Sequence, residues 1–263
     1  MRKLGINYIK TFPLSLADNL ALLSQTGFQS VFTLHEGAAE TERYATAAAD
    51  AGLTYESLHA PWDGINSIWQ EGDAGETMLR RLTDCLDSCS RNNIPIAVVH
   101  LSSGRNAPCV NDLGHKRFDR LIDHAVKTGV TVAFENQRML ANLAFVMELY
   151  RDIPQAGFCW DTGHEACFAG GREYMPLFGD RLVYTHIHDN LSQPNGDLHM
   201  IPFDGNTDFI RRAAHLRNSG FTGTLTLEIM PTSSPFYPDI TAEAYYQKAY
   251  AAVTRLRDLI EQV

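Results

Sequence analysis

The feature that most constrains the fold of this chain is a regular alternation of short apolar segments with helical segments. Eight apolar segments are predicted to form strands, at residues 4–8, 30–34, 54–59, 94–101, 130–134, 156–160, 182–187 and 224–229. A segment with helical periodicity follows each of them, and glycines such as Gly27 and Gly129 end several of these helices. Strands that are apolar along nearly their whole length are typical of a parallel sheet covered on both faces.

The length of the chain favours one closed (β/α)8 barrel over an open, doubly wound α/β sheet. The chain has 263 residues, and a barrel of eight strand–helix units typically needs about 250. No Gly/Ser-rich linker or change of composition separates the units, so residues 1–263 are predicted to form a single domain. In such a barrel, the active site is built at the carboxyl ends of the strands and in the loops that follow them.

Residue types that bind metals stand at or near the ends of the last six predicted strands. They are His59, His100, Glu135, Asp161, His186 and Glu228. Another histidine, His164, follows Asp161 by one turn, and Asp197 and His199 lie in the loop after the seventh strand. These side chains would converge on one mouth of the barrel. Buried carboxylates and neutral imidazoles have a divalent cation as their natural partner, and this mixed set suits Mn, Zn, Co or Mg.

Most of these residues also have a structural interpretation when they are taken singly. His59 and His100 could bond to backbone carbonyls, and Glu135 could accept from loop amides. His188 could line the pocket or only brace the loop. Glu228 is the strongest candidate, because it lies within the apolar run Thr-Leu-Thr-Leu-Glu-Ile-Met, where an unpaired carboxylate would be costly.

The charge of the chain bears on whether it binds nucleic acid, and its cysteine content bears on its cellular compartment. Lys plus Arg total 22 and Asp plus Glu total 31, so the formal net charge is −9. An acidic surface repels nucleic acid unless a local basic patch overrides it, and no such patch stands out. Five cysteines without a framework spacing fit a reducing, cytoplasmic compartment. No signal peptide and no membrane-spanning segment are expected.

In these residues and the motifs around them, the chain resembles the xylose isomerase-like TIM-barrel superfamily. This superfamily includes sugar phosphate isomerases/epimerases and endonuclease IV. The resemblance covers essentially the whole chain. Its marks are Leu-His-Ala-Pro at 58–61, Val-Val-His at 98–100, Phe-Glu-Asn at 134–136, Trp-Asp-Thr-Gly-His at 160–164, Thr-His-Ile-His-Asp at 185–189, Gly-Asp-Leu-His at 196–199 and Leu-Glu at 227–228. Together they are specific for the superfamily but not for one activity within it.

The resemblance implies a metal-dependent sugar or sugar phosphate isomerase/epimerase that acts by proton transfer through an enediolate. One divalent ion would be held by Glu135, Asp161, His186 and Glu228. Glu135 and Glu228 would also transfer the proton. Substrate contacts would come from His164, His59, His100, Trp62 and His199. The expected partner is a small sugar or polyol, with no nucleic acid, no membrane and a possible homo-oligomer. Of the other aromatic residues, Trp69, Phe203 and Trp160 could stack on a sugar ring or exclude water, although Trp160 could equally belong to the core.

Other activities on the same barrel remain as alternatives. In endonuclease IV, three zinc ions use the same ligands plus His59, His100, His164, Asp197 and His199. The net charge of −9 and the acidic loop 62–76, which has no Lys or Arg, argue against that activity. A dehydratase or lyase and a non-catalytic binding protein are further alternatives. Ser192 and Ala141 stand where ketose 3-epimerases have arginine and glutamate, and Pro202-Phe203 replaces the usual Pro-Gly.

Overall fold

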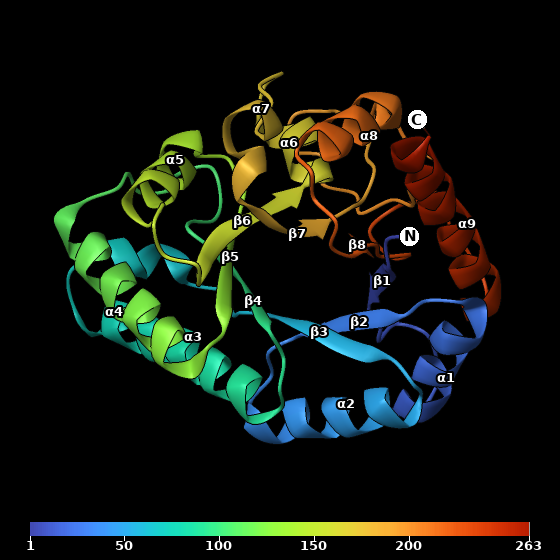
Figure 1. The fold of residues 1–263 in the computed structure, drawn as a ribbon, viewed down its shortest axis with the longest axis horizontal. Coiled ribbons are helices and arrows are strands. Elements are labelled where there is room, and N and C mark those ends of the chain that lie inside the picture. Colours follow the sequence, from blue (N-terminus) through green and yellow to red (C-terminus); the bar gives the residue numbers. More distant parts are fainter. Residues whose placement is uncertain (263) are drawn as a thin grey trace. The chain divides into compact units, whose positions relative to one another are not determined.

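The computed structural model describes residues 1–262, and its eight strands form the sheet of a (β/α)8 barrel (Figure 1). The strands are β1 (Leu4–Asn7), β2 (Ser30–Leu34), β3 (Thr54–His59), β4 (Ile96–His100), β5 (Thr131–Glu135), β6 (Ala156–Asp161), β7 (Leu182–His186) and β8 (Leu225–Leu227). Neighbouring strands follow the order β7-β6-β5-β4-β3-β2-β1-β8. A parallel bridge between Ile187 and Leu227 joins the chain after β7 to β8, as a closed barrel requires. The predicted fold class is confirmed.

Helices follow the strands along the chain. They are α1 (Leu16–Thr26), α2 (Ala38–Asp50), α3 (Asp73–Arg91), α4 (Asp112–Thr128), α5 (Leu140–Leu149), α6 (Thr162–Phe168), α7 (Met175–Phe178), α8 (Phe209–Asn218) and α9 (Ala242–Glu261), with 3-10 turns η1 (Ile65–Trp69) and η2 (Gly179–Arg181). Gly27 and Gly129 end α1 and α4, as predicted, and the structure shows both in the left-handed conformation. Within residues 1–262, none of these helices combines the length and the apolar character that crossing a membrane demands.

Helix α6 is the main element that the sequence analysis missed. The Thr-Gly pair after Asp161 looks like a turn, but it is the first turn of a helix of seven residues. Asp161 caps this helix, because its Oδ1 accepts a hydrogen bond of 2.6 Å from the backbone N–H of His164. A helix this short shows no apolar periodicity, so only the capping geometry reveals it.

The chain forms two compact units by its internal contacts. The first unit contains Met1–Phe32, Thr46–Tyr55 and the chain from Trp160 onward, and the second contains Thr33–Ala45 and Glu56–Cys159. The candidate residues divide between these units. His59, Trp62, His100 and Glu135 belong to the second unit, and Asp161, His164, His186, His188, Asp197, His199 and Glu228 belong to the first.

The strand register aligns the residues on which the candidate site depends. Strands β4 and β5 are parallel, and their register pairs His100 with Glu135. Strands β5 and β6 are also parallel, and their register pairs Glu135 with Cys159. Every residue of β6 is buried, which agrees with the apolar run that predicted this strand.

Candidate metal and substrate site

In the second unit, two histidines converge on the carboxylate of Glu135. His100 Nε2 lies 2.6 Å from Glu135 Oε2, and His59 Nε2 lies 3.4 Å from the same oxygen. All three side chains are buried. His59 Nδ1 lies 2.8 Å from the carbonyl oxygen of Ala60, which can only accept, so this nitrogen carries a proton. In a neutral His59, Nε2 therefore turns a lone pair toward Glu135, an arrangement that favours a cation or a proton between them.

Trp62 covers this group at the surface. Its ring centroid lies 5.0 Å from that of His59 and 5.9 Å from that of His100, and 38% of the residue is exposed. An exposed indole beside two imidazoles is suited to pack against the apolar face of a sugar ring. The structure thus places the ring of Trp62 beside those of His59 and His100.

The loop after β3, which carries Trp62, is held firmly in place. Arg117 of α4 donates to the carbonyl oxygens of Ile68 and Gln70, at 2.9 and 2.7 Å. Trp69 Nε1 donates to the carbonyl of Leu101 at 2.6 Å, next to His100. Buried donors and acceptors paired in this way resist opening. The sequence carries no signal for this role of Arg117, because an arginine within a helix usually faces solvent.

We expect Trp62→Ala to raise KM about tenfold, because loss of one aromatic stacking contact costs about 1.4 kcal/mol. The unfolding temperature should change little, since the side chain is partly exposed. Trp62→Phe, which keeps an aromatic face, is the matched control and should retain most of the affinity. The measurement is the KM from steady-state kinetics, with a sugar that the wild-type protein converts as the substrate. An unchanged KM for Trp62→Ala would remove this residue from the substrate site.

In the first unit, one carboxylate from the end of β6 meets residues from β7 and β8. Asp161, His186 and Glu228 each offer a ligand atom within 4.8 Å of the others. His186 Nδ1 lies 3.5 Å from Glu228 Oε2. The ring of His186 stacks on Phe32, with centroids 4.7 Å apart, so its orientation is fixed. The carboxylate oxygens of buried Asp161 and half-buried Glu228, with the buried imidazole of His186, form a donor set that fits a divalent metal.

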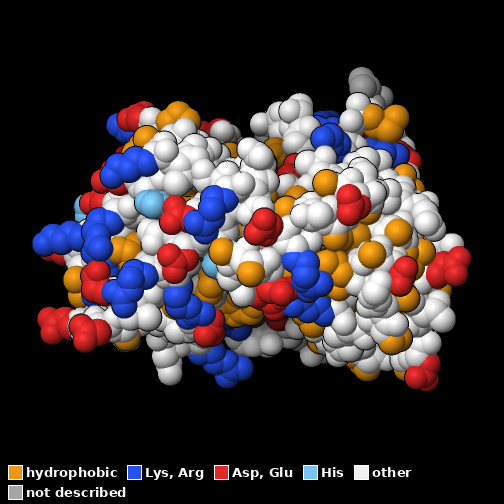
Figure 2. Space-filling view, turned by 90° about the horizontal axis from the view of Figure 1, so that it is seen from below, with side chains coloured by type: hydrophobic (Ala, Val, Ile, Leu, Met, Phe, Trp, Pro, Cys, Tyr) orange, Lys and Arg blue, Asp and Glu red, His pale blue; other side chains and the backbone are white. Residues whose placement is uncertain are grey.

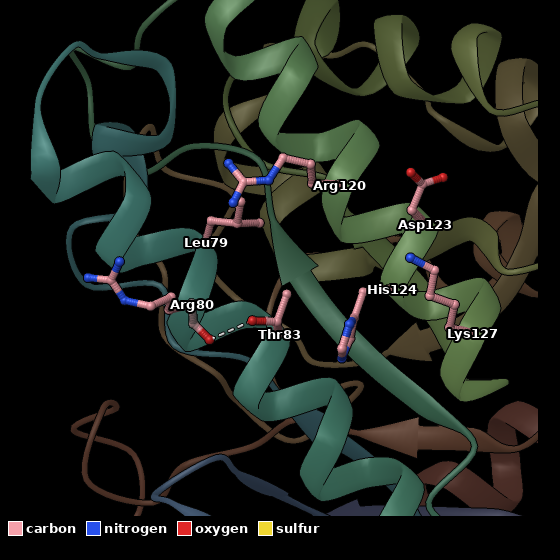
Figure 3. Close-up of a pocket in the computed structure, with 7 residues that line it drawn as sticks. All are labelled: Leu79, Arg80, Thr83, Arg120, Asp123, His124 and Lys127. Carbon is pink, nitrogen blue, oxygen red and sulfur yellow. Dashed lines mark hydrogen bonds between the residues drawn. The ribbon is translucent and has the colours of Figure 1, made fainter.

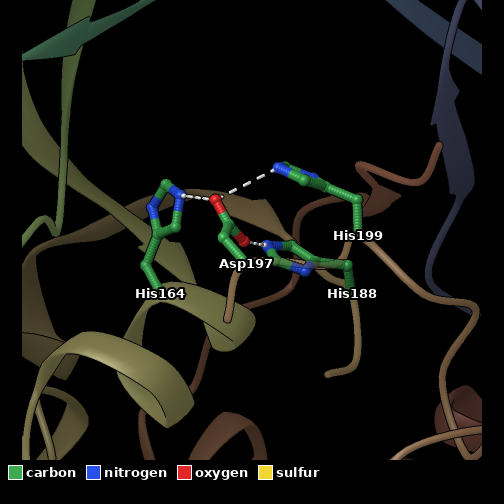
Figure 4. A group of neighbouring side chains, drawn as sticks. All are labelled: His164, His188, Asp197 and His199. Atoms are coloured by element: carbon green, nitrogen blue, oxygen red, sulfur yellow. Dashed lines mark ion pairs between the residues drawn. The ribbon is translucent and has the colours of Figure 1, made fainter. Parts of the chain in front are cut away.

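A second group in the same unit surrounds Asp197, as Figure 4 shows. His164 Nε2 and His199 Nε2 lie 3.2 and 3.3 Å from Asp197 Oδ2. His188 Nε2 lies 3.8 Å from Asp197 Oδ1. Three imidazoles around one carboxylate could also hold a metal ion.

Asp197 and His199 each shift the pKa of the other, and their nearest side-chain atoms lie 3.3 Å apart. Burial opposes ionisation of Asp197, but the charge of His199 and hydrogen bonds from His164 and His199 hold the pKa of this carboxyl well below its usual range. Burial also opposes protonation of His199, yet Asp197, with further help from Glu228 and Asp161, raises the pKa of His199 to about 10. The contribution of His199 to stability is therefore complete below its ordinary pKa of about 6.5 and is lost as the pH rises toward 10.

His188 connects the two groups. Its Nε2 lies 3.0 and 3.1 Å from the two carboxylate oxygens of Asp161. Its ring stacks on His199, with centroids 4.2 Å apart and planes inclined by 17°. Its backbone N–H donates to Thr162 Oγ1, and its carbonyl accepts from the same hydroxyl. The sequence is compatible with His188 lining the pocket or bracing the loop, and the structure places it directly against Asp161.

The other aromatic candidates have structural roles. Trp69 is buried and binds Leu101, so it does not line a substrate site. Trp160 belongs to the core, and its Nε1 donates to the buried carboxylate of Glu165 at 2.9 Å. Phe203 packs on Phe209, and the guanidinium of Arg255 lies 4.0 Å from its ring centroid.

A shallow groove of about 280 Å³ lies between α3 and α4 (Figure 3). It is lined by Leu79, Arg80, Thr83, Arg120, Asp123, His124 and Lys127. On the face in Figure 2, basic and acidic side chains are interspersed rather than gathered into patches of one sign. This face therefore has no patch of one sign that would attract a nucleic acid backbone.

The sequence of this chain is similar to one family of proteins and to two uncharacterized proteins. The sequence matches the family model of the xylose isomerase-like TIM barrel over residues 20–256. An uncharacterized protein of Sinorhizobium fredii, y4fM, is 26% identical, with 84% of this chain and 80% of that protein covered. An uncharacterized protein of Methanocaldococcus jannaschii, MJ1311, is 19% identical, with 86% and 83% covered.

Two solved enzymes have similar structures. D-psicose 3-epimerase from Clostridium cellulolyticum H10, solved with D-tagatose, has a TM-score of 0.78 and 13% identity, over 99% of this chain and all of the other. The 3-keto-D-glucoside 4-epimerase YcjR from E. coli has a TM-score of 0.73 and 17% identity, over 98% of this chain and all of the other. At these identities the similarity shows a shared fold.

Proposed function

Because the chain belongs to the xylose isomerase-like TIM barrel family, we propose that it is a divalent-metal-dependent sugar isomerase or epimerase. The observation that carries this proposal is the meeting of Asp161, His186 and Glu228 at the ends of three strands, within 4.8 Å of one another. The names of the two structurally similar enzymes, both sugar epimerases, support the same class of reaction.

We propose Glu135 as the fourth ligand of the same ion. It is the last residue of β5, and the register of β5 with β6 pairs it with Cys159, two residues before Asp161. Two carboxyl ends of adjacent parallel strands lie at the same edge of a sheet, which is where a barrel carries its active site. The completed set of three carboxylates and one imidazole suits Mn, Zn, Co or Mg.

Glu135 and Glu228 are the proposed acid–base residues. One carboxylate would remove the proton from the carbon next to the substrate carbonyl, giving an enediolate. The same carboxylate would return the proton on that face, or the other would return it on the opposite face. When bound, the metal polarises the carbonyl and stabilises the negative charge on its oxygen. The proposed substrate contacts are His164, His59, His100, Trp62 and His199.

Proton exchange with solvent tests this proposal directly. The Mn²⁺-loaded protein is expected to exchange the α-proton of at least one ketose or aldose with deuterated water, followed by NMR. Product analysis then separates an epimerase or isomerase from a dehydratase or lyase, because only the latter two lose water or a carbon fragment. Protein treated with a chelator is the control. A loaded protein that exchanges no proton across ketoses, aldoses and keto acids contradicts the proposal, and sugar binding without exchange supports a non-catalytic role.

The number of bound ions separates sugar chemistry from phosphodiester chemistry. We expect about one Mn²⁺ per chain at saturation, because one mixed carboxylate–imidazole set serves the proposed reaction. Asp161→Ala should abolish binding of this ion. Asp239→Asn, which changes an exposed carboxylate in the loop after β8, should leave binding intact. Metal analysis and anomalous scattering provide the measurement.

The groups around Glu135 and Asp197 favour a second candidate, a three-metal nuclease of the endonuclease IV type. Both groups gather further imidazoles on a carboxylate. Three tightly bound ions per chain, together with cleavage of a duplex at an abasic site, would support this candidate over the isomerase. The net charge of −9 argues against a nuclease, because an acidic protein repels the phosphates of a duplex.

A further inference from the structure

Phosphorylated substrates have a usual binding place in barrels of this kind. The phosphate lies between the loops after the seventh and eighth strands, against the N-terminus of a helix. Free backbone N–H groups and a positive helix end hold the anion there. In this chain, the corresponding elements are the loop 187–208, the loop 228–241 and the start of α8, and all of them belong to the first unit.

The backbone N–H groups of the first of these loops already bind an internal anion, the carboxylate of Asp189. Its Oδ1 accepts from the N–H groups of Asn190, at 2.8 Å, and Thr207, at 3.0 Å. Its Oδ2 accepts from the N–H of Gly205 at 2.8 Å. Asp189 is fully buried. Three backbone donors aimed at one buried carboxylate are therefore not available to a phosphate.

The close approach of the loop to Asp189 depends on a glycine. A Cβ at Gly205 would lie 2.4 Å from the carbonyl oxygen of Asn190 and 2.6 Å from Asp189 Oδ1. Such distances are far below van der Waals contact, so a side chain at this position would push the loop off the carboxylate. The lack of a side chain at Gly205 thus lets the loop N–H groups stay bound to the carboxylate of Asp189.

The N-terminus of α8 is also occupied by a carboxylate. Asp208 caps the helix, because its Oδ1 accepts from the backbone N–H of Arg211 at 3.0 Å. A second anion at this helix end would meet the negative charges of both Asp208 and Asp189.

The two loops offer no lysine or arginine in compensation, and the imidazole of His199 is paired with Asp197 at 3.3 Å. Residues 187–208 and 228–241 contain no Lys or Arg, whereas they contain Asp189, Asp197, Asp204, Asp208, Glu228 and Asp239. Lys248 of α9 reaches the first loop, but its Nζ pairs with Asp204 at 2.8 Å. A phosphate group carries nearly two negative charges at neutral pH, so this part of the mouth repels it.

We infer that the substrate is an unphosphorylated, uncharged sugar or polyol-type compound. This inference rests on the proposed sugar isomerase or epimerase function and narrows it, because that function leaves open whether the sugar is phosphorylated. Asp189 takes the place that a substrate phosphate would need, and the acidic loops exclude an anion from its surroundings.

The first test needs no turnover. Inorganic phosphate is titrated into metal-free protein, and the unfolding temperature is followed. The wild type should show no saturable increase. Asp189→Ala, which frees three N–H groups, should be less stable and should regain stability with phosphate. Asp50→Ala, which removes an exposed carboxylate at the end of α2, should behave as the wild type. Saturable stabilisation of the wild type by phosphate would overturn the inference, even if Asp189→Ala does not fold.

The second test compares matched substrates on the wild-type, Mn²⁺-loaded protein. Free ketohexoses are paired with their 1-phosphate and 6-phosphate esters, and binding is measured by calorimetry alongside α-proton exchange. The free sugar of a pair should be favoured about 100-fold in affinity or in kcat/KM. A phosphate ester that binds as well as its free sugar refutes the inference and leaves the proposed function standing. A free sugar that binds but exchanges no proton refutes the proposed function and leaves the preference for uncharged ligands standing.

Discussion

Replacing Glu228 by glutamine is expected to slow α-proton exchange about 100- to 10,000-fold, the range that a positioned acid–base group contributes. The substitution keeps the size of the side chain and removes its basicity. Glu228 Oε2 lies 3.5 Å from His186 Nδ1 and 3.8 Å from His199 Nδ1, so a neutral amide would remain in a polar setting. The backbone of Glu228 is unaffected, since its N–H bonds to Ile187 and its carbonyl accepts from His199. The fold should therefore survive.

The measurement is exchange of the substrate α-proton in deuterated water, with metal content determined on the same samples. Glu243→Gln, an exposed glutamate in the first turn of α9, is the matched control and should leave the exchange rate unchanged. If Glu228→Gln kept bound metal and exchanged protons at the wild-type rate, Glu228 would not be an acid–base residue. Loss of metal together with loss of exchange would support the ligand role of Glu228 alone.

Replacing Gly163 by alanine is expected to lower the free energy of unfolding by about 1–3 kcal/mol, the usual cost of overpacking a core. A Cβ at Gly163 would lie 1.9 Å from Cε1 and 2.3 Å from Nδ1 of His188. The ring cannot move aside freely, because it binds Asp161 and stacks on His199. Displacing it would release a carboxylate that we propose as a metal ligand. Loss of such a supporting contact typically weakens metal affinity about 10- to 100-fold.

Thermal unfolding and metal titration of the purified variant check this expectation. Gly179→Ala is the matched control, because an added Cβ there would meet Met175 Cε and Ser219 Cβ at 3.3 Å, a contact that small shifts can relieve. The two variants make the same chemical change in different surroundings. Equal stability and equal metal affinity for both would show that the contact between Gly163 and His188 does not support the site.

The candidate site was predictable to the extent that it depends on strand ends. Glu135, Asp161 and His186 each end a buried strand, and an apolar run that stops at a polar residue shows this in the sequence. His188 was left undecided, although alternation beyond β7 puts it on the same side as His186 and could have revealed it. Asp189 gave no such signal, since a carboxylate that binds loop N–H groups resembles any surface aspartate in a sequence.

Sequence alone determined the (β/α)8 fold and the residue types available for chemistry, because hydrophobic periodicity and strand ends are local properties of the chain. Tertiary structure decided which of these residues act together. It joined His188 to Asp161, bound the carboxylate of Asp189 to N–H groups of its own loop and placed Trp69 in the core. Such pairings depend on loop paths and on close approaches at single glycines, which arise from contacts between residues distant along the chain and leave no periodic pattern in it.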